Sequence, residues 1–229
     1  MSIVLQNSKH HLHYFFRARH RRGHGVHSPF AYRLIAGIIE EEHPYYCYAE
    51  LEARRAGLKA QRAVQEPKPE GFQCSGRELP VSGSDAPTGK HCLTPADARL
   101  LFRLANAFSY CIVMEWGGID EITRLYLQRA SSKLEIYQGG QESAVLPELL
   151  YCNANLAESA LSLALEQALS QKTTQSLLVL AGPHRSAGAY RCWQQLLTHP
   201  DVRLSVEMKR LGLVFFNPEL QKNHYILRR

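Results

Sequence analysis

Glu115, Gly117 and Gly118 lie where the chain should pass from a strand into a helix. The short apolar run at 110–114 is typical of a buried strand, and apolar residues resume at helical spacing from Ile122. In a parallel sheet, a glycine turn at this point lets a ligand approach the backbone. The start of the following helix offers N–H groups to a negatively charged group. The pattern therefore makes these three residues candidates for binding a nucleotide-type ligand.

Gln138 occupies a second position that could contact such a ligand. It directly follows a predicted strand at 133–137 and precedes Gly139 and Gly140. An acid at the end of the second strand commonly binds ribose hydroxyls, and a glutamine can still hydrogen-bond to them but lacks the charge. Two glycines are a weak signal by themselves, because a turn needed only for packing explains them equally well.

His27 and His184 are the candidate catalytic residues. We expect both near the carboxyl ends of the strands, where an imidazole can move a proton at neutral pH. The alternative is that each histidine only satisfies local hydrogen bonds. No metal site is predicted, because the histidines within 10–13 and 20–27 have no cysteine or acid at ligand spacing.

The elements that would position these residues alternate between strands and helices. Capping signals at Ser28-Pro29 and Thr94-Pro95 begin two of the helices. The apolar periodicity predicts helices at 29–41, 50–65, from 95, from 122, at 156–169 and at 189–197, and strands at 110–114, 133–137, 177–180, 202–208 and 211–216, with a further edge strand at 225–227. The unit from 110 to 138 is β-α-β, so its strands should be parallel, whereas the short connection between 208 and 211 predicts an antiparallel pair.

Composition divides the chain into three regions. Residues 1–65 form a basic, helical N-terminal extension, residues 66–91 a flexible loop rich in proline and glycine, and residues 92–229 a Rossmann-like α/β domain. With 229 residues, of which 45% are hydrophobic and 21% charged, the chain can bury one substantial core.

Basic and aromatic side chains alternate in the segment His10–Arg22, and the whole chain has a formal net charge of +6. Such a segment could bind an acidic partner, including a nucleic acid, through phosphate contacts and base stacking. The alternative is a short amphipathic helix whose basic face is simply solvated.

The sequence predicts neither a signal peptide nor a membrane span. The N-terminus has no apolar core of signal-peptide length, and no run of roughly eighteen apolar residues could span a membrane. The six cysteines include no C-x-x-C pair, which favours reduced thiols. We therefore expect a cytoplasmic protein that makes no membrane contact.

Three segments resemble a known family. They are Gly-Val-His-Ser-Pro-Phe at 25–30, Arg-Leu-Leu-Phe-Arg-Leu-Ala-Asn at 99–106 and Leu-Gly-Leu-Val-Phe-Phe-Asn-Pro-Glu at 211–219. In their order along nearly the whole chain, they look like a group of Bacteroidetes class I S-adenosylmethionine-dependent methyltransferases. The resemblance implies a Rossmann-like methyltransferase fold, S-adenosylmethionine as cofactor, and transfer of its methyl group to an unknown acceptor.

The first donor-binding motif of that family is only partly present. It looks like E-L-G-T-x-x-G, which Glu115 and Gly117 match, whereas Trp116, Gly118 and Glu121 depart from it. The departure at Glu121 removes a glycine that would allow close approach of a ligand.

Later positions of the donor site also differ. Gln138 stands where the family has a glutamate that binds ribose, and Ala181, Gly182 and Pro183 stand where it has aspartates before a histidine that His184 matches. The interval from Gln138 to residue 176 is too short for two helices and two strands of ordinary length, so we expect one β-α unit to be missing.

Two functions remain open at this point. One is a methyltransferase with a modified donor site, acting on a small-molecule or macromolecular acceptor. The other is a catalytically inactive homologue that serves as a binding or scaffold protein for an acidic or nucleic-acid partner. Methyl transfer needs mainly proximity and alignment, so a modified pocket is compatible with activity.

Overall fold

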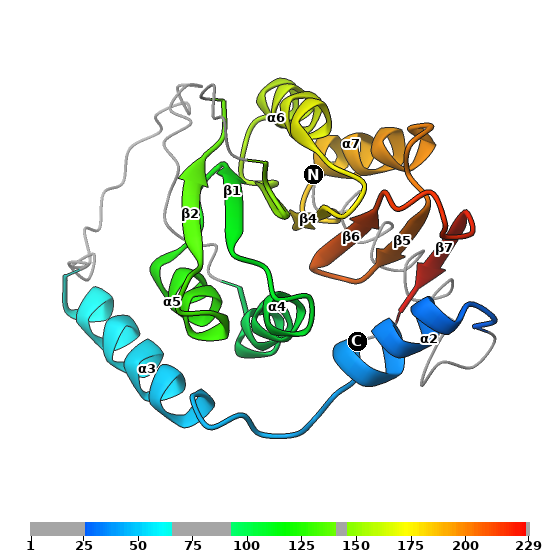
Figure 1. Ribbon diagram of the computed structural model, residues 1–229. Coiled ribbons are helices and arrows are strands. Elements are labelled where there is room, and N and C mark those ends of the chain that lie inside the picture. The colour runs from blue at the N-terminus through cyan, green and yellow to red at the C-terminus, as the bar shows by residue number, and fades with distance from the viewer. Residues whose placement is uncertain (1–25, 66–92, 141–145, 228–229) are drawn as a thin grey trace, which may run out of the picture.

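The computed structural model describes residues 26–65, 93–140 and 146–227, and Figure 1 shows how their helices and strands are arranged. The basic segment at 10–22 and the predicted loop at 66–91 lie outside these ranges, so the expectations for them stay predictions. Among the described helices, none is both long and apolar enough to cross a membrane.

A seven-stranded sheet forms the centre of the molecule, in the order β2-β1-β3-β4-β6-β5-β7. Its strands are β1 (Ile112–Trp116), β2 (Glu135–Gln138), β3 (Leu149–Asn153), β4 (Leu177–Ala181), β5 (Leu204–Glu207), β6 (Leu211–Phe215) and β7 (Asn223–Ile226). The first four are mutually parallel, and β6 runs antiparallel to its neighbours β4 and β5. This confirms the predicted α/β, Rossmann-like class with an antiparallel C-terminal pair.

The chain changes direction across the sheet between β1 and β3. It leaves β1 through α5 (Glu121–Ala130) and reaches β2 on one side, whereas β3 lies on the other side of β1 and leads through α6 (Glu158–Gln171) to β4. In open α/β sheets, ligands bind at the carboxyl ends of the strands beside such a switch point. We name the edge where β1 to β4 end the carboxyl edge, and the opposite edge the amino edge.

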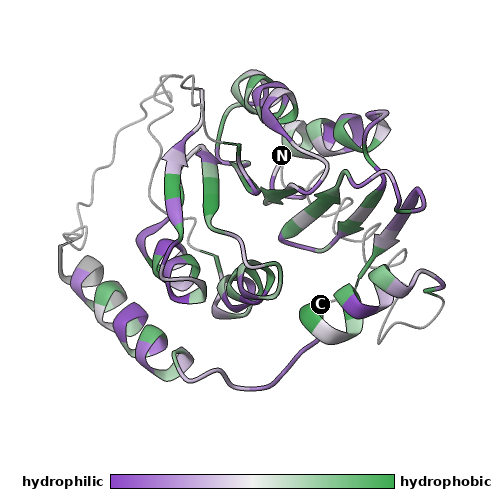
Figure 2. Cartoon of the chain, in the orientation of Figure 1, coloured by the Kyte–Doolittle hydropathy of each residue, from purple (hydrophilic) through white to green (hydrophobic). Residues whose placement is uncertain are grey.

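Helices cover both faces of the sheet (Figure 1). One face carries α4 (Pro95–Ala107), α5, α2 (Pro29–Leu34) and the short π-helix η1 (Ile35–Ile39), and the other carries α6 and α7 (Ala187–Thr198). The outer helix α3 (Tyr48–Gln65) packs on α4 and α5. In Figure 2 the inner strands are largely hydrophobic, because helices cover them on both faces. The helix α3 alternates in hydropathy, because only one of its faces is buried.

Side-chain caps begin the helices at the predicted places. Thr94 Oγ1 accepts the N–H of Asp97, and Asp97 Oδ2 accepts the N–H of Thr94, both at 3.3 Å. Ser28 accepts the N–H of Ala31 in the same way at the start of α2. These bonds satisfy N–H groups that a helix start leaves without partners, so the local sequence alone fixes both starting points.

Arg103 of α4 completes the end of the predicted helix at 29–41. This helix is α2 followed by η1, and its last carbonyl groups have no partner within the helix itself. Arg103 Nε donates to the carbonyl of Ile38 at 2.7 Å, and its guanidinium donates to that of Ile39 at 3.1 Å. The buried arginine thus ties η1 to α4.

One strand was not predicted. The interval between Gln138 and residue 176 contains β3 and α6, and no second helix lies among its described residues. The sheet nevertheless has seven strands, so the expectation of a missing β-α unit applies to this interval only and stays a prediction. The edge strand expected at 225–227 is β7, which pairs with β5.

Candidate functional site

Gly117 belongs to the carboxyl edge and is packed against the loop that follows β3. Its φ of +79° is a conformation that favours glycine. A side-chain carbon at this position would lie 3.0 Å from both the carbonyl oxygen of Asn153 and the side chain of Leu156. The glycine is therefore required for the contact between the β1 and β3 loops as well as for the turn.

Gly118 is the open part of the same turn. It also has a φ of +79°, but among the described residues no atom beyond its chain neighbours lies within 4 Å of the position that a side-chain carbon would take. Its carbonyl accepts a hydrogen bond from Nδ2 of Asn153 at 3.0 Å. The backbone at Gly118 is exposed, so a ligand could approach it from solvent.

Glu115 stabilises the turn through its buried carboxylate. Oε2 accepts the backbone N–H of Ile119 at 2.8 Å, and Oε1 accepts a hydrogen bond from the Arg124 guanidinium at 2.8 Å. Only 5% of the residue is exposed. Because both oxygens are engaged within the chain, Glu115 orients the turn and the start of α5.

The start of α5 carries its own acidic cap. Asp120 Oδ1 accepts the N–H of Thr123 at 3.1 Å, and Oδ2 accepts the Thr123 hydroxyl at 2.5 Å. Glu121 follows in the first turn and is exposed. Two carboxylates at this helix start disfavour an anionic group and favour a cationic one, so the expectation of an anion site at these N–H groups is not supported.

Gln138 ends β2 directly beside β1, where it pairs in register with Glu115. Its side chain is exposed at the carboxyl edge. The next residue, Gly139, lies under the indole ring of Trp116, and an added side-chain carbon there would come within 2.0 Å of that ring. Trp116 Nε1 donates to Oε1 of Gln167 in α6 at 3.0 Å, so the indole spans from the end of β2 to α6.

His184 follows β4 and is buried against Glu207 at the end of β5. Its Nε2 lies 3.1 Å from Oε1 of Glu207, and its ring stacks on Tyr190. Glu207 Oε2 also accepts Nε1 of Trp193 at 2.8 Å and lies 3.2 Å from Nε2 of His224. One buried carboxylate thus joins the loop after β4 to α7 and β7.

The surroundings of Glu207 act on its titration in opposite directions. Burial alone would raise the pKa of this carboxyl group. The hydrogen bonds from His184, His224 and Trp193 outweigh that effect and hold the pKa well below its usual range. Glu207 is therefore a charged group that the fold itself stabilises.

The two candidate catalytic histidines lie at opposite edges of the sheet. His27 is exposed and directly precedes α2, whose Phe30 lies at the amino edge. The expectation that both histidines lie near the carboxyl ends of the strands is therefore wrong for His27. His184 does lie at the carboxyl edge, but β3 and β4 separate it from the strand β1 that leads to Gly118.

Sequence reasoning missed two residues that organise this edge. Asn153 was missed because β3 was not predicted, although an asparagine directly after an apolar run is a typical turn residue. Glu207 is a lone acid between Val206 and Met208 in a buried strand. Because acids are almost never buried without a partner, this position could have been predicted to form a buried ion pair or hydrogen bond. No group of three or more histidine, cysteine or acidic side chains that could hold a metal occurs among the described residues.

Solved structures that are similar to this chain include two of low sequence identity. No protein-family model matches the chain, and no curated protein matches it. The crystal structure of cofactor-bound Rv0187 from MTB is 14% identical, with a TM-score of 0.46 over 78% of this chain and 99% of that one. The O-methyltransferase TomG from Streptomyces achromogenes, involved in tomaymycin synthesis and solved with SAM, is 11% identical, with a TM-score of 0.46 over 76% of this chain and 91% of that one.

Proposed function

We propose that this protein is a methyltransferase-like protein that binds S-adenosylmethionine at its carboxyl edge, around Gly118 and Gln138. The observation that carries the proposal is the open side of the β1–α5 turn, where the backbone of Gly118 is exposed beside the sheet's switch point. Gln138 exposes its amide at the same edge of the sheet. The acceptor of the methyl group is left open.

The residues around this turn fit the chemistry of such a donor. The Gln138 amide can both donate to and accept from ribose hydroxyls. The donor carries a positive sulfonium, and the carboxylates of Asp120 and Glu121 at the start of α5 favour a positive charge. The exposed backbone at Gly118 allows close approach, because no side chain stands there.

S-adenosylmethionine, when bound, supplies an activated methyl group. Transfer then requires mainly that an acceptor be held in line with that group. The protein itself holds and orients the donor through the turn that the Glu115–Arg124 contact stabilises. Neither His27 nor His184 lies beside Gly118, so we assign neither of them a proton transfer in this reaction.

Calorimetric titration of the full chain with S-adenosylmethionine tests the proposal. We expect saturable heat, and a Gln138→Ala variant should bind roughly tenfold more weakly, the equivalent of about 1.4 kcal/mol for lost hydrogen bonds to ribose. Gln128→Ala, on the exposed side of α5, is the matched control and should bind like the original chain. The absence of both heat and a thermal shift at millimolar donor would refute donor binding.

A second candidate function is that of a catalytically inactive homologue serving as a binding or scaffold protein. Two contacts within the chain at the switch point favour this function, because they occupy groups that a ligand would otherwise bind. They are the Asn153–Gly118 hydrogen bond and the packing of Trp116 on Gly139. For this function the titration with donor gives no heat. Binding of RNA or DNA that weakens steeply with salt would then support it, and unchanged binding after removal of residues 1–25 would count against the basic segment as the contact surface.

A further inference from the structure

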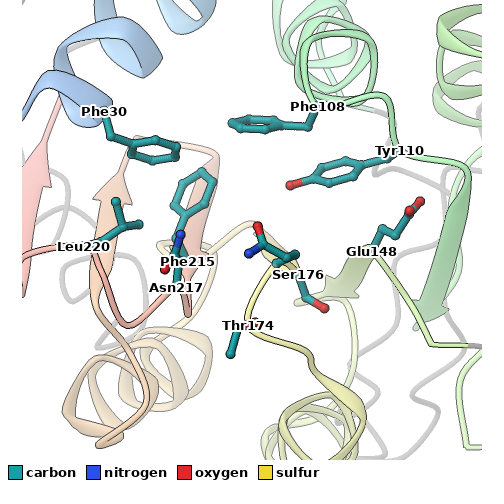
Figure 3. A pocket seen from close by; sticks show the side chains of 10 residues that line it. Phe30, Phe108, Tyr110, Glu148, Thr174, Ser176, Phe215, Asn217 and Leu220 are labelled. Carbon is teal, nitrogen blue, oxygen red and sulfur yellow. The ribbon is translucent and has the colours of Figure 1, made fainter.

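A hollow of about 180 Å³ opens at the amino edge of the sheet, on the side opposite Gly118. Tyr110 precedes β1, Glu148 and Ser176 precede β3 and β4, and Phe215 ends the antiparallel strand β6. These starts and ends therefore meet around one space, which Phe30 of α2 also lines (Figure 3). No function argued for the carboxyl edge uses this space.

Four aromatic rings form the walls of the hollow and hold one another in place. The rings of Phe30 and Phe215 meet edge to face with centroids 5.3 Å apart, and those of Phe108 and Tyr110 stack at 5.4 Å. Phe30 and Phe108 are 6.2 Å apart, which joins the two pairs. Such distances are those of favourable aromatic pairs, so the walls are preformed and suit an apolar, planar ligand.

The hydroxyl of Tyr110 points into the hollow (Figure 3). Only 5% of the residue is exposed, and its hydroxyl makes no hydrogen bond with any residue that the structure describes. Burial, with the nearby Glu148 carboxylate, raises the pKa of this phenol, so it stays protonated. The lining of the hollow also includes the polar residues Thr174, Gln175, Ser176 and Asn217, but none of these side chains accepts a hydrogen bond from the phenol. A ligand can therefore supply the acceptor for the protonated hydroxyl.

Glu148 gives this space its electrostatic character. Its Oε2 accepts the N–H groups of Cys111 at 2.5 Å and Ile112 at 3.0 Å, which fix the start of β1. Among the described residues that line the hollow, Glu148 is the one acidic or basic side chain. A negative charge at the wall disfavours an anionic ligand.

We propose that the amino-edge hollow is a binding site for a small neutral aromatic molecule whose hydrogen-bond acceptor meets the hydroxyl of Tyr110. The aromatic side chains favour binding of a flat apolar ring. The phenol favours a ring that carries a hydrogen-bond acceptor, and the charge of Glu148 disfavours an anion of the same shape. This site is separate from the carboxyl edge and does not depend on the function proposed there.

Benzamide and benzoate form a matched pair of probes, because they share size and shape and differ in charge at neutral pH. In ligand-titrated NMR spectra of the full chain, benzamide should shift the resonances of Phe30, Phe108 and Phe215 in a saturable way, and benzoate should bind at least about tenfold more weakly. This comparison needs no variant. Equal binding of the two probes, or no saturable shift with benzamide, would overturn the proposal.

Two variants separate the roles of Tyr110 and Glu148. Tyr110→Phe should weaken benzamide by roughly tenfold while leaving toluene, which has no acceptor, unchanged. Glu148→Gln keeps an oxygen that can accept the N–H groups of Cys111 and Ile112 but removes the charge, so benzoate should bind it more tightly than it binds the original chain. Unchanged affinity for benzamide in Tyr110→Phe would show that the phenol does not contact the ligand.

Discussion

Buried side chains at the two edges of the sheet differ in how fully they are hydrogen-bonded. At the carboxyl edge, Glu115 is held by Ile119 and Arg124, and the buried carboxylate of Glu207 accepts Trp193 and lies beside two histidines. At the amino edge, Tyr110 points into a hollow a hydroxyl that has no hydrogen-bond partner among the described residues. The difference shows that a glycine at a switch point, such as Gly117, can be required by packing. The capacity to bind a ligand then depends on the polar groups that the fold leaves accessible.

The largest expected effect comes from removing the carboxylate that joins the carboxyl edge. Glu207→Ala would leave donors from Trp193, His184 and His224 without their partner in a buried place. We expect a loss of about 3–5 kcal/mol in the free energy of unfolding, measured by urea denaturation, as for other broken buried charge pairs. Glu219→Ala, at an exposed acid, should change it by less than about 0.5 kcal/mol.

The contribution of Glu207 should also depend on pH. Because its pKa is lowered in the folded chain, the stabilisation is present above the ordinary pKa of a glutamate and is lost as the pH falls below it. The free energy of unfolding should therefore fall more steeply on acidification in the original chain than in Glu207→Gln. Parallel curves for the two proteins would mean that the carboxylate gains nothing from its neighbours.

Substitutions at two glycines of the carboxyl edge should have intermediate effects on the free energy of unfolding, each for a different reason. Gly139→Ala would place a methyl group about 2.0 Å from the Trp116 ring, so the ring or the strand must move, at a cost of about 1–3 kcal/mol in the free energy of unfolding. Gly118→Ala meets no neighbour in the described part of the chain and should cost only the roughly 1–2 kcal/mol of a left-handed backbone. Thermal denaturation can check both values.

The double variant Gly139→Ala/Trp116→Ala provides the control for that contact. If the clash with the indole causes the cost, Gly139→Ala should be much less harmful in a chain that already lacks the ring. Additive losses would place the cause in the backbone at Gly139 and not in its contact with Trp116.

The smallest effect is expected at the amino edge. Tyr110→Phe removes a hydroxyl that has no hydrogen-bond partner among the described residues and keeps the ring that stacks on Phe108. The free energy of unfolding should therefore change by less than about 0.5 kcal/mol, or rise slightly. A loss of more than about 1.5 kcal/mol in chemical denaturation would indicate that the hydroxyl is bound within the folded chain.

Local signals in the sequence predicted most of the elements but not how their side chains meet. The caps at Ser28 and Thr94 and the apolar runs at β1 and β4 act over a few residues, so the sequence pattern reveals them. β3 was not predicted because its apolar run is only a few residues long. A strand of this size is hard to distinguish from a turn without its partners.

The candidate site was predictable in outline only. The place of Gly117, Gly118 and Gln138 at one edge follows from the β-α-β pattern. Whether a residue is available to a ligand depends on contacts between distant segments, such as the packing of Trp116 on Gly139 and Gln167. The same reason explains why His27 and His184 could not be assigned to opposite edges from sequence.

The link between Arg103 and η1 bears on the order in which the chain acquires its structure. The last carbonyls of η1 receive their hydrogen bonds from a side chain of α4, more than sixty positions further along the chain. The end of η1 therefore cannot be completed by its own segment and must wait for α4 to dock. In pulse-labelled hydrogen exchange during refolding, the amides of η1 should become protected later than those of α4. Simultaneous protection would mean that the two helices form as one unit and that the arginine joins no early and late part of the fold.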